Sequence, residues 1–163
     1  MCFESIYLIK ATPPRAEWLT RPPPISASNA RLTCFTDASW NSTSHKAGGG
    51  WYCIDHENVI ILQGARVFEI ISSPLMAEAI AIRSALLHAL EAGITEICIK
   101  SDYQALIAAI FSKRFPADLY RISRDIETLS LCFVCISFCF IPRNLNSRAD
   151  SMAKFVLNSS PTN

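Results

Sequence analysis

The sequence predicts an α/β protein in which a mixed sheet is flanked by helices. Two observations support this prediction. Apolar stretches of strand length alternate with stretches whose apolar residues recur every three or four positions, in the order β-β-β-α-β-α-α-β-α. Half of the residues are hydrophobic and the formal net charge is +1, which is typical of a globular domain with a substantial core.

Three strands are expected first. The stretch RLTCFTD, residues 31–37, is short, apolar and ends in an acid. Residues 47–68 hold two more strands, joined by a turn around Asp55 to Asn58. The glycines of AGGGWY favour close packing or a bulge, because the stretch lacks the lysine of a phosphate-binding loop.

The remaining elements alternate between helix and strand. Residues 74–93 predict a helix with Pro74 in its first turn and Gly93 at its end. TEICIKSD, residues 95–102, predicts a strand that again ends in an acid. Helices are expected over 103–113 and 118–130, a strand over 131–142 and a closing helix over 144–158.

Composition divides the chain into three parts. The first thirty residues contain five prolines, three of them consecutive, and predict a disordered, proline-rich linker over 1–30. The folded domain is expected over 31–158 and a disordered tail over 159–163. From Arg31 onward there are 12 Lys and Arg against 12 Asp and Glu, so nucleic-acid binding would have to come from local patches or metal ions.

The seven cysteines indicate a reducing compartment. Their number is odd, most lie in apolar stretches, and the first ten residues do not form a secretory signal. We therefore expect an intracellular protein, nuclear or cytoplasmic, that is not secreted and does not cross a membrane. Cys132, Cys135 and Cys139 are expected to be core thiols, because Cys132 and Cys135, three residues apart on a strand, point to opposite faces and cannot share a zinc ion.

Four carboxylates occupy positions that packing alone explains poorly. Asp37 and Asp102 each end an apolar strand, where α/β folds place ligand sites. Glu78 falls on the apolar face of its helix, where an unpaired carboxylate costs several kcal/mol. Asp150 shares a helix face with Asn146. The alternatives are that Glu78 lies at the margin of the apolar face and reaches water, and that Asp150 is a solvated helix acid.

Taken together, the four acids predict a metal site. Clustered carboxylates raise one another's pKa and favour a hard cation. An all-oxygen donor set suits Mg²⁺, and two such ions could activate a water molecule and stabilise the leaving oxygen in phosphodiester cleavage.

Four motifs also carry a family resemblance. TDASW, MAEAIAIRSAL, KSDYQALI and NSRADSMAK resemble the type 1 ribonuclease H family, in particular the ribonuclease H-like domains of plant retroelement reverse transcriptases and their domesticated relatives. The resemblance spans residues 31–157. It implies the ribonuclease H-like fold, a five-stranded mixed sheet whose first three strands are antiparallel.

The resemblance also implies an activity and a set of site residues. Family members cleave the RNA strand of RNA–DNA hybrids with two Mg²⁺ ions, for which Mn²⁺ can substitute. The ligand set falls on Asp37, Glu78, Asp102 and Asp150. The substrate contacts fall on Ser39, Gln104, Asn146 and Arg143. A monomer whose partner is an RNA–DNA hybrid is expected.

Two departures from the family pattern leave alternatives open. Bacterial and retroviral members carry a mobile histidine before the last helix, whereas this chain has Arg143, so that either turnover is slow or Arg143 binds a phosphate directly. The basic protrusion of some members is absent. The alternatives to an active nuclease are a catalytically weak or inactive nucleic-acid-binding domain domesticated from a retroelement, and a retroelement remnant without a selected role.

Overall fold

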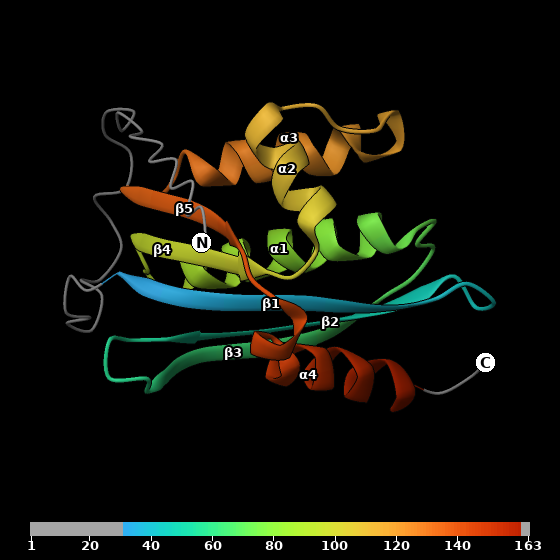
Figure 1. Ribbon diagram of the computed structural model, residues 1–163, viewed down its shortest axis with the longest axis horizontal. Helices are drawn as coiled ribbons and strands as arrows, with labels where there is room; N and C mark the ends of the chain where they lie inside the picture. The colour runs from blue at the N-terminus through green and yellow to red at the C-terminus, as the bar shows by residue number, and fades with distance from the viewer. Residues whose placement is uncertain (1–30, 161–163) are drawn as a thin grey trace.

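The computed structural model describes residues 31–160, so that the expected linker 1–30 and residues 161–163 lie outside the described part. Five strands form one mixed sheet in the order β3-β2-β1-β4-β5 (Figure 1). Neighbouring strands among β1, β2 and β3 are antiparallel, and β4 and β5 run parallel to β1. The expected five-stranded mixed sheet, with its first three strands antiparallel, is confirmed. The elements are β1 (Leu32–Asn41), β2 (Lys46–Ile54), β3 (Ile60–Phe68), α1 (Pro74–Glu91), β4 (Glu96–Ser101), α2 (Gln104–Ser112), η1 (Ala117–Leu119), α3 (Tyr120–Ser130), β5 (Cys135–Phe140), η2 (Arg143–Leu145) and α4 (Ser147–Asn158).

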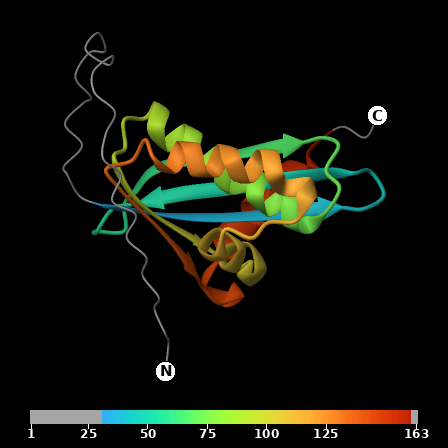
Figure 2. The same ribbon diagram turned by 90° about the horizontal axis from the view of Figure 1, so that it is seen from above.

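The helices lie on both sides of the sheet. Helices α1, α2 and α3 lie on one side and α4 lies on the other (Figures 1 and 2). Helix α1 packs on β1 and β2 and against α3, whereas α4 packs on β1, β2 and β3. The main core fills the α1 side, with Ile82, Leu86, Ile97, Ile99 and Ile136 almost completely buried. None of the described helices is both long and apolar enough to span a bilayer.

Local signals fix both ends of α1. The Ser73 hydroxyl accepts a hydrogen bond of 3.1 Å from the Met76 amide, and Pro74 occupies the first turn, where its missing N–H costs nothing. Gly93, with φ of 78°, takes the left-handed conformation that lets the chain leave the helix. The ends of this helix agree with the prediction, and they set the depth at which Glu78 faces the sheet.

Glycines in β2 allow α4 to approach the sheet closely. A Cβ added to Gly48 would lie 2.2 Å from the carbonyl oxygen of Ala153, and one added to Gly50 would lie 2.7 Å from the Met152 Cβ. Real Cβ atoms do not tolerate such distances. The glycines therefore serve close packing, as expected, but against a helix rather than against another strand.

Some element boundaries differ from the prediction. Strand β1 does not end at Asp37, because its antiparallel pairing with β2 continues to Asn41 after its parallel pairing with β4 has ended at Phe35. Strand β5 begins only at Cys135, so Cys132 is exposed and outside the strand rather than a core thiol. Helix α4 ends at Asn158, as expected, and Ser159 caps it by donating its amide to the Phe155 carbonyl.

Candidate metal centre

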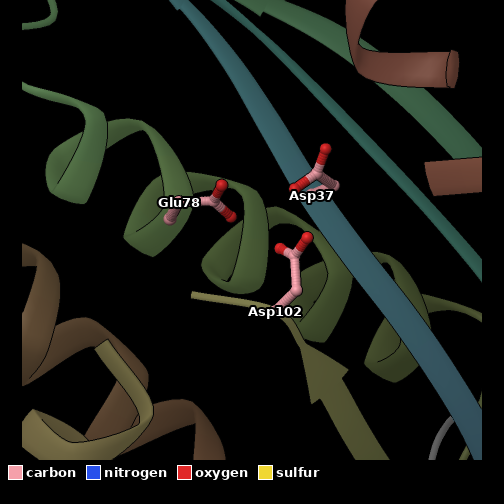
Figure 3. Close-up of side chains that lie close together, drawn as sticks. All are labelled: Asp37, Glu78 and Asp102. Carbon is pink, nitrogen blue, oxygen red and sulfur yellow. The ribbon is translucent and has the colours of Figure 1, made fainter. Parts of the chain in front are cut away.

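Three elements bring three carboxylates together. Asp37 comes from β1, Glu78 from α1 and Asp102 from the residue after β4, and the three side chains point toward one another (Figure 3). One oxygen of each lies within 4.8 Å of the other two. Asp37 and Glu78 are each only 4% exposed. These acids line a cavity of about 210 Å³ together with Ala38, Pro74, Tyr103 and Arg143.

The register of the sheet explains how residues so distant in sequence meet. The last parallel pair of β1 and β4 is Phe35 with Lys100, so Asp37 and Asp102 each follow two residues later at the same level. Glu78 lies in the second turn of α1, the helix that packs on β1. The prediction that Glu78 faces the sheet is confirmed, and the alternative that it reaches water at the margin of the apolar face is wrong.

The three acids form a strained electrostatic arrangement. Burial raises the pKa of Asp37 to about 8, and the charges of Asp102 and Asp150 contribute to this increase. Burial, followed by the charges of Asp37 and Asp102, raises the pKa of Glu78 well above its ordinary value, although a hydrogen bond from the Ala38 backbone opposes the shift. None of the ion pairs among residues 31–160 involves Asp37, Glu78 or Asp102.

These features fit a divalent cation. The donor set consists of carboxylate oxygens only, which hard ions such as Mg²⁺ and Mn²⁺ prefer. The Glu78 Oε2 atom is buried without a hydrogen-bond partner, which proteins rarely tolerate unless something else satisfies the atom. A bound cation would neutralise the repulsion and satisfy this oxygen. The cluster can therefore hold a divalent metal ion.

Asp150 lies beside this cluster, not within it. It is close enough to Asp37 to raise the pKa of that group, yet it is not one of the three acids whose oxygens all lie within 4.8 Å of one another. Its carboxylate accepts a hydrogen bond of 2.7 Å from the Lys154 ammonium group, one helical turn away. Of the four predicted ligands, three therefore surround one position and the fourth lies next to Asp37.

The expected substrate-contacting residues occupy different environments. Gln104 is exposed at the start of α2, and Ser39 is half-buried within β1 opposite Gly48, not in a turn. Arg143 is exposed in η2 and lines the cavity. Asn146 is completely buried, and its side-chain amide donates a hydrogen bond of 2.9 Å to the Thr36 carbonyl. In this structure Asn146 holds β1 and does not reach the surface.

Some residues around the site were not predicted. Lys154 could have been found from its position four residues after Asp150, the spacing of an ion pair on a helix. Tyr103 adjoins Asp102 in sequence, but nothing in the pattern shows that its side chain lines the cavity. The sequence pattern predicts only that Pro74 starts a helix, whereas in the structure it also forms part of the cavity wall.

A larger hollow of about 780 Å³ lies elsewhere, between β3 and α1. It contains the Trp51 indole, which donates a hydrogen bond of 3.1 Å to His88 Nδ1, and the side chains of Arg66 and Glu91. None of the clustered carboxylates lines this hollow. The smaller cavity is the better candidate for chemistry because the unneutralised acids converge there.

Several solved structures share this fold. Ribonuclease H1 from the halophilic archaeon Halobacterium salinarum matches with a TM-score of 0.74 and 23% identity, over 80% of this chain and 99% of that one. LC11-RNase H1, from compost, solved in complex with an RNA/DNA hybrid, matches with a TM-score of 0.71 and 18% identity, over 78% and 97% of the two chains. A foamy viral protease-reverse transcriptase in complex with an RNA/DNA hybrid matches with a TM-score of 0.68 and 16% identity, over 90% of this chain and 22% of that one.

At these identities the likeness concerns the fold, and the fold of this chain is that of ribonuclease H. No curated protein matches the chain in sequence. A family model described as reverse transcriptase-like matches residues 35–156, a range that includes the three clustered acids and Asp150. The chain therefore belongs to the reverse transcriptase-like family.

Proposed function

We propose that this domain is a metal-dependent endonuclease that hydrolyses the RNA strand of RNA–DNA hybrids. The observation that carries the proposal is the convergence of Asp37, Glu78 and Asp102 within 4.8 Å, where none of them forms an ion pair with a basic side chain of residues 31–160. Two structures with the same fold contain an RNA/DNA hybrid, which supports the choice of substrate. Two Mg²⁺ ions are the proposed cofactor, and Mn²⁺ is expected to substitute.

Each acid has a separate role in this proposal. Asp37, Glu78 and Asp102 would hold the metal, and Asp150, which lies near Asp37, would complete the ligand set. When bound, divalent ions of this kind lower the pKa of water and stabilise charge on phosphoryl oxygens. Asp37 and Glu78 are almost completely buried, so little bulk water would compete with a bound ion for their carboxylates.

Arg143 is proposed to bind a phosphate of the substrate. It lines the same cavity, and its guanidinium group can donate two parallel hydrogen bonds to phosphate oxygens. RNA would be distinguished from DNA by its 2′-hydroxyl groups and groove shape, without readout of the bases. On the sequence motifs alone, we further propose an intracellular, monomeric domain that derives from a plant retroelement.

Strand-specific cleavage tests the proposal. A hybrid labelled separately on each strand is incubated with the protein and Mg²⁺, and the products are separated on a denaturing gel. The RNA strand should be cut and the DNA strand should stay intact. Asp37→Asn and Asp102→Asn should each lower the rate by more than about a hundredfold, because losing even an outer partner of a metal ligand costs 10–100-fold.

The matched control is Asp118→Asn, which removes an exposed acid in η1. This variant should cut the hybrid at the rate of the unaltered chain. Normal cleavage by both Asp37→Asn and Asp102→Asn would refute the proposed mechanism.

One observation favours a second function, binding without efficient cleavage. Arg143 occupies the rim of the cavity, and an arginine stays protonated and cannot relay a proton as a histidine can. The same gel assay, run also under native conditions, separates the two functions. A hybrid that is shifted by the protein but remains intact in both Mg²⁺ and Mn²⁺ would favour the binding domain.

A further inference from the structure

A row of five paired side chains crosses all five strands on the side of the sheet that carries α4. Successive partners in the register are Cys139 of β5, Lys100 of β4, Phe35 of β1, Tyr52 of β2 and Gln63 of β3. None of these residues is buried: Gln63 is exposed and the other four are half-buried. We refer to this set as the cross-strand row.

At the centre of the row, two aromatic rings are stacked and a cationic side chain lies over each of them. The rings of Phe35 and Tyr52 are stacked, with centroids 4.9 Å apart and an interplanar angle of 10°. The Lys100 ammonium group lies over the Phe35 ring at 5.8 Å from its centroid, and the Arg148 guanidinium group, from α4, lies over the Tyr52 ring at 5.0 Å. Arg148 also donates a hydrogen bond of 3.4 Å to the Gln63 side chain.

Both cations are left without a negative partner. Within residues 31–160, neither Lys100 nor Arg148 forms an ion pair with a carboxylate. The folded part of the chain has as many acids as basic residues, so these two charges are a local excess and not part of a generally basic surface. The rings restrict the two side chains, which lowers the entropy that they would lose on binding an anion.

The cross-strand row borders the metal centre. Phe35 precedes Asp37 by two residues on β1, and Lys100 precedes Asp102 by two residues at the end of β4. Two residues of a strand span about 7 Å and return to the same face of the sheet. Arg148 comes from α4, which also carries Asp150, and its guanidinium group reaches the row over the Tyr52 ring. A nucleic-acid strand held at the carboxylates therefore has unpaired cations immediately beside it.

We propose that Lys100 and Arg148 bind phosphates of the nucleic-acid strand next to the phosphate held at the carboxylate cluster. This inference rests on the proposed function, and it assigns the neighbouring contacts to residues outside the metal centre. The contact is to the backbone and not to the bases, because the faces of Phe35 and Tyr52 are already covered by each other and by the two cations. Binding through the row is therefore independent of base sequence and sensitive to salt.

The salt dependence of binding tests this proposal. A fluorescently labelled RNA–DNA hybrid is titrated with the protein at a series of KCl concentrations in the presence of Mg²⁺. All variants carry Asp102→Asn so that the hybrid stays intact, which a gel verifies. Each lost phosphate contact lowers the slope of log K against log salt by about 0.9. The double variant Lys100→Gln with Arg148→Gln should therefore lower the slope by about 1.8.

Two further variants separate this effect from a loss of charge or of structure. Arg121→Gln with Arg124→Gln removes two exposed cations from α3 and should leave the slope unchanged. Lys100→Arg with Arg148→Lys keeps both charges and should keep the slope. If the Gln double variant melts early, each single Gln variant is measured alone, with an expected decrease of about 0.9.

Three results would overturn the proposal: equal slopes for the Gln variants and the parent chain, an equal decrease in the α3 control, or no hybrid binding by the parent chain at the lowest salt concentration. Cleavage by the chain with Asp102 intact is scored separately. If the Gln variants lower the slope but the chain with Asp102 intact does not cleave the hybrid, the phosphate contacts of the row are supported and the proposed hydrolase activity is refuted. If that chain cleaves the hybrid but the Gln variants leave the slope unchanged, the hydrolase activity is supported and the phosphate contacts are refuted.

Discussion

The side-chain amide of Asn146 donates a hydrogen bond of 2.9 Å to the carbonyl oxygen of Thr36, the residue immediately before Asp37. Parallel pairing between β1 and β4 has already ended at Phe35, so this bond continues to hold β1 where β4 no longer pairs with it. The backbone carbonyl of Asn146 also accepts the amide of Asp150 at 3.1 Å. One buried residue thus connects the segments that carry Asp37 and Asp150.

Replacing Asn146 by alanine should weaken both the fold and the metal centre. The Thr36 carbonyl would be left unpaired, which costs about 1–3 kcal/mol in the free energy of unfolding. Asp37 and Asp150 would be held less firmly, so cleavage should require more Mg²⁺. Urea denaturation measures the first effect and a Mg²⁺ titration of cleavage the second. Asn144→Ala, two residues earlier in η2 and exposed, is the control. An unchanged Mg²⁺ requirement in Asn146→Ala would exclude the positioning role.

Adding a methyl group at Gly50 should displace α4. The new Cβ would lie 2.7 Å from the Met152 Cβ and 2.8 Å from the Ala153 backbone nitrogen, and backbone cannot move aside cheaply. We expect Gly50→Ala to lower the free energy of unfolding by about 1–3 kcal/mol and to reduce cleavage, because Asp150 moves with α4. The control is Gly64→Ala, which would crowd the Trp51 ring. Equal activity loss in the two variants would show that the position of α4 is not the cause.

Without metal, the protein should become less stable as the pH rises. The pKa of Asp37 is about 8 in the folded chain and about 3.8 when the group is free, so between these values the folded chain holds a proton that the unfolded chain has lost. The free energy of unfolding therefore falls from about pH 4 to about pH 8, and the raised pKa of Glu78 acts in the same direction.

Urea denaturation in EDTA at about pH 5.5 and about pH 8 measures this loss of stability. Asp37→Asn should show a smaller loss than the unaltered chain, and saturating Mg²⁺ should reduce the loss in the unaltered chain. A midpoint that is constant over this range in EDTA would show that the acids do not repel one another as the structure indicates.

Removing the guanidinium group of Arg143 should weaken substrate binding more than metal binding. Arg143→Ala should raise KM by roughly tenfold, the effect of losing about 1.4 kcal/mol of binding, while the Mg²⁺ requirement stays constant. Arg143→Lys should recover part of the lost substrate affinity, because lysine keeps the positive charge but cannot donate the two parallel hydrogen bonds of a guanidinium group. Steady-state kinetics on the hybrid provide the measurement, with Arg114→Ala as an exposed control. An unchanged KM in Arg143→Ala would show that Arg143 does not contribute to substrate binding.

Most of the fold could be predicted because the relevant signals are local. The Ser73 and Pro74 start and the Gly93 end of α1 depend on neighbouring residues, as does the turn after β2. The end of β1 could not be predicted in this way. Whether the strand stops at Asp37 depends on β2, which pairs with it up to Asn41, and this pairing partner is remote in sequence.

The same distinction applies to the site. Glu78 could be identified because a carboxylate on an apolar helix face is locally anomalous, and it is indeed buried. The environment of Asn146 could not be inferred, since its partner Thr36 is 110 residues away. The stacked arrangement of Lys100, Phe35, Tyr52 and Arg148 likewise depends on the register between strands and on the placement of α4. Neither can be predicted from the sequence of a single segment.

Direct binding of Mg²⁺ tests the central claim, that Asp37, Glu78 and Asp102 form a metal centre. Isothermal titration calorimetry near neutral pH compares the unaltered chain with Asp37→Asn and with the exposed control Asp118→Asn. We expect saturable binding in the unaltered chain and in the control, and binding at least about tenfold weaker in Asp37→Asn. Identical titration curves for all three proteins would contradict the account.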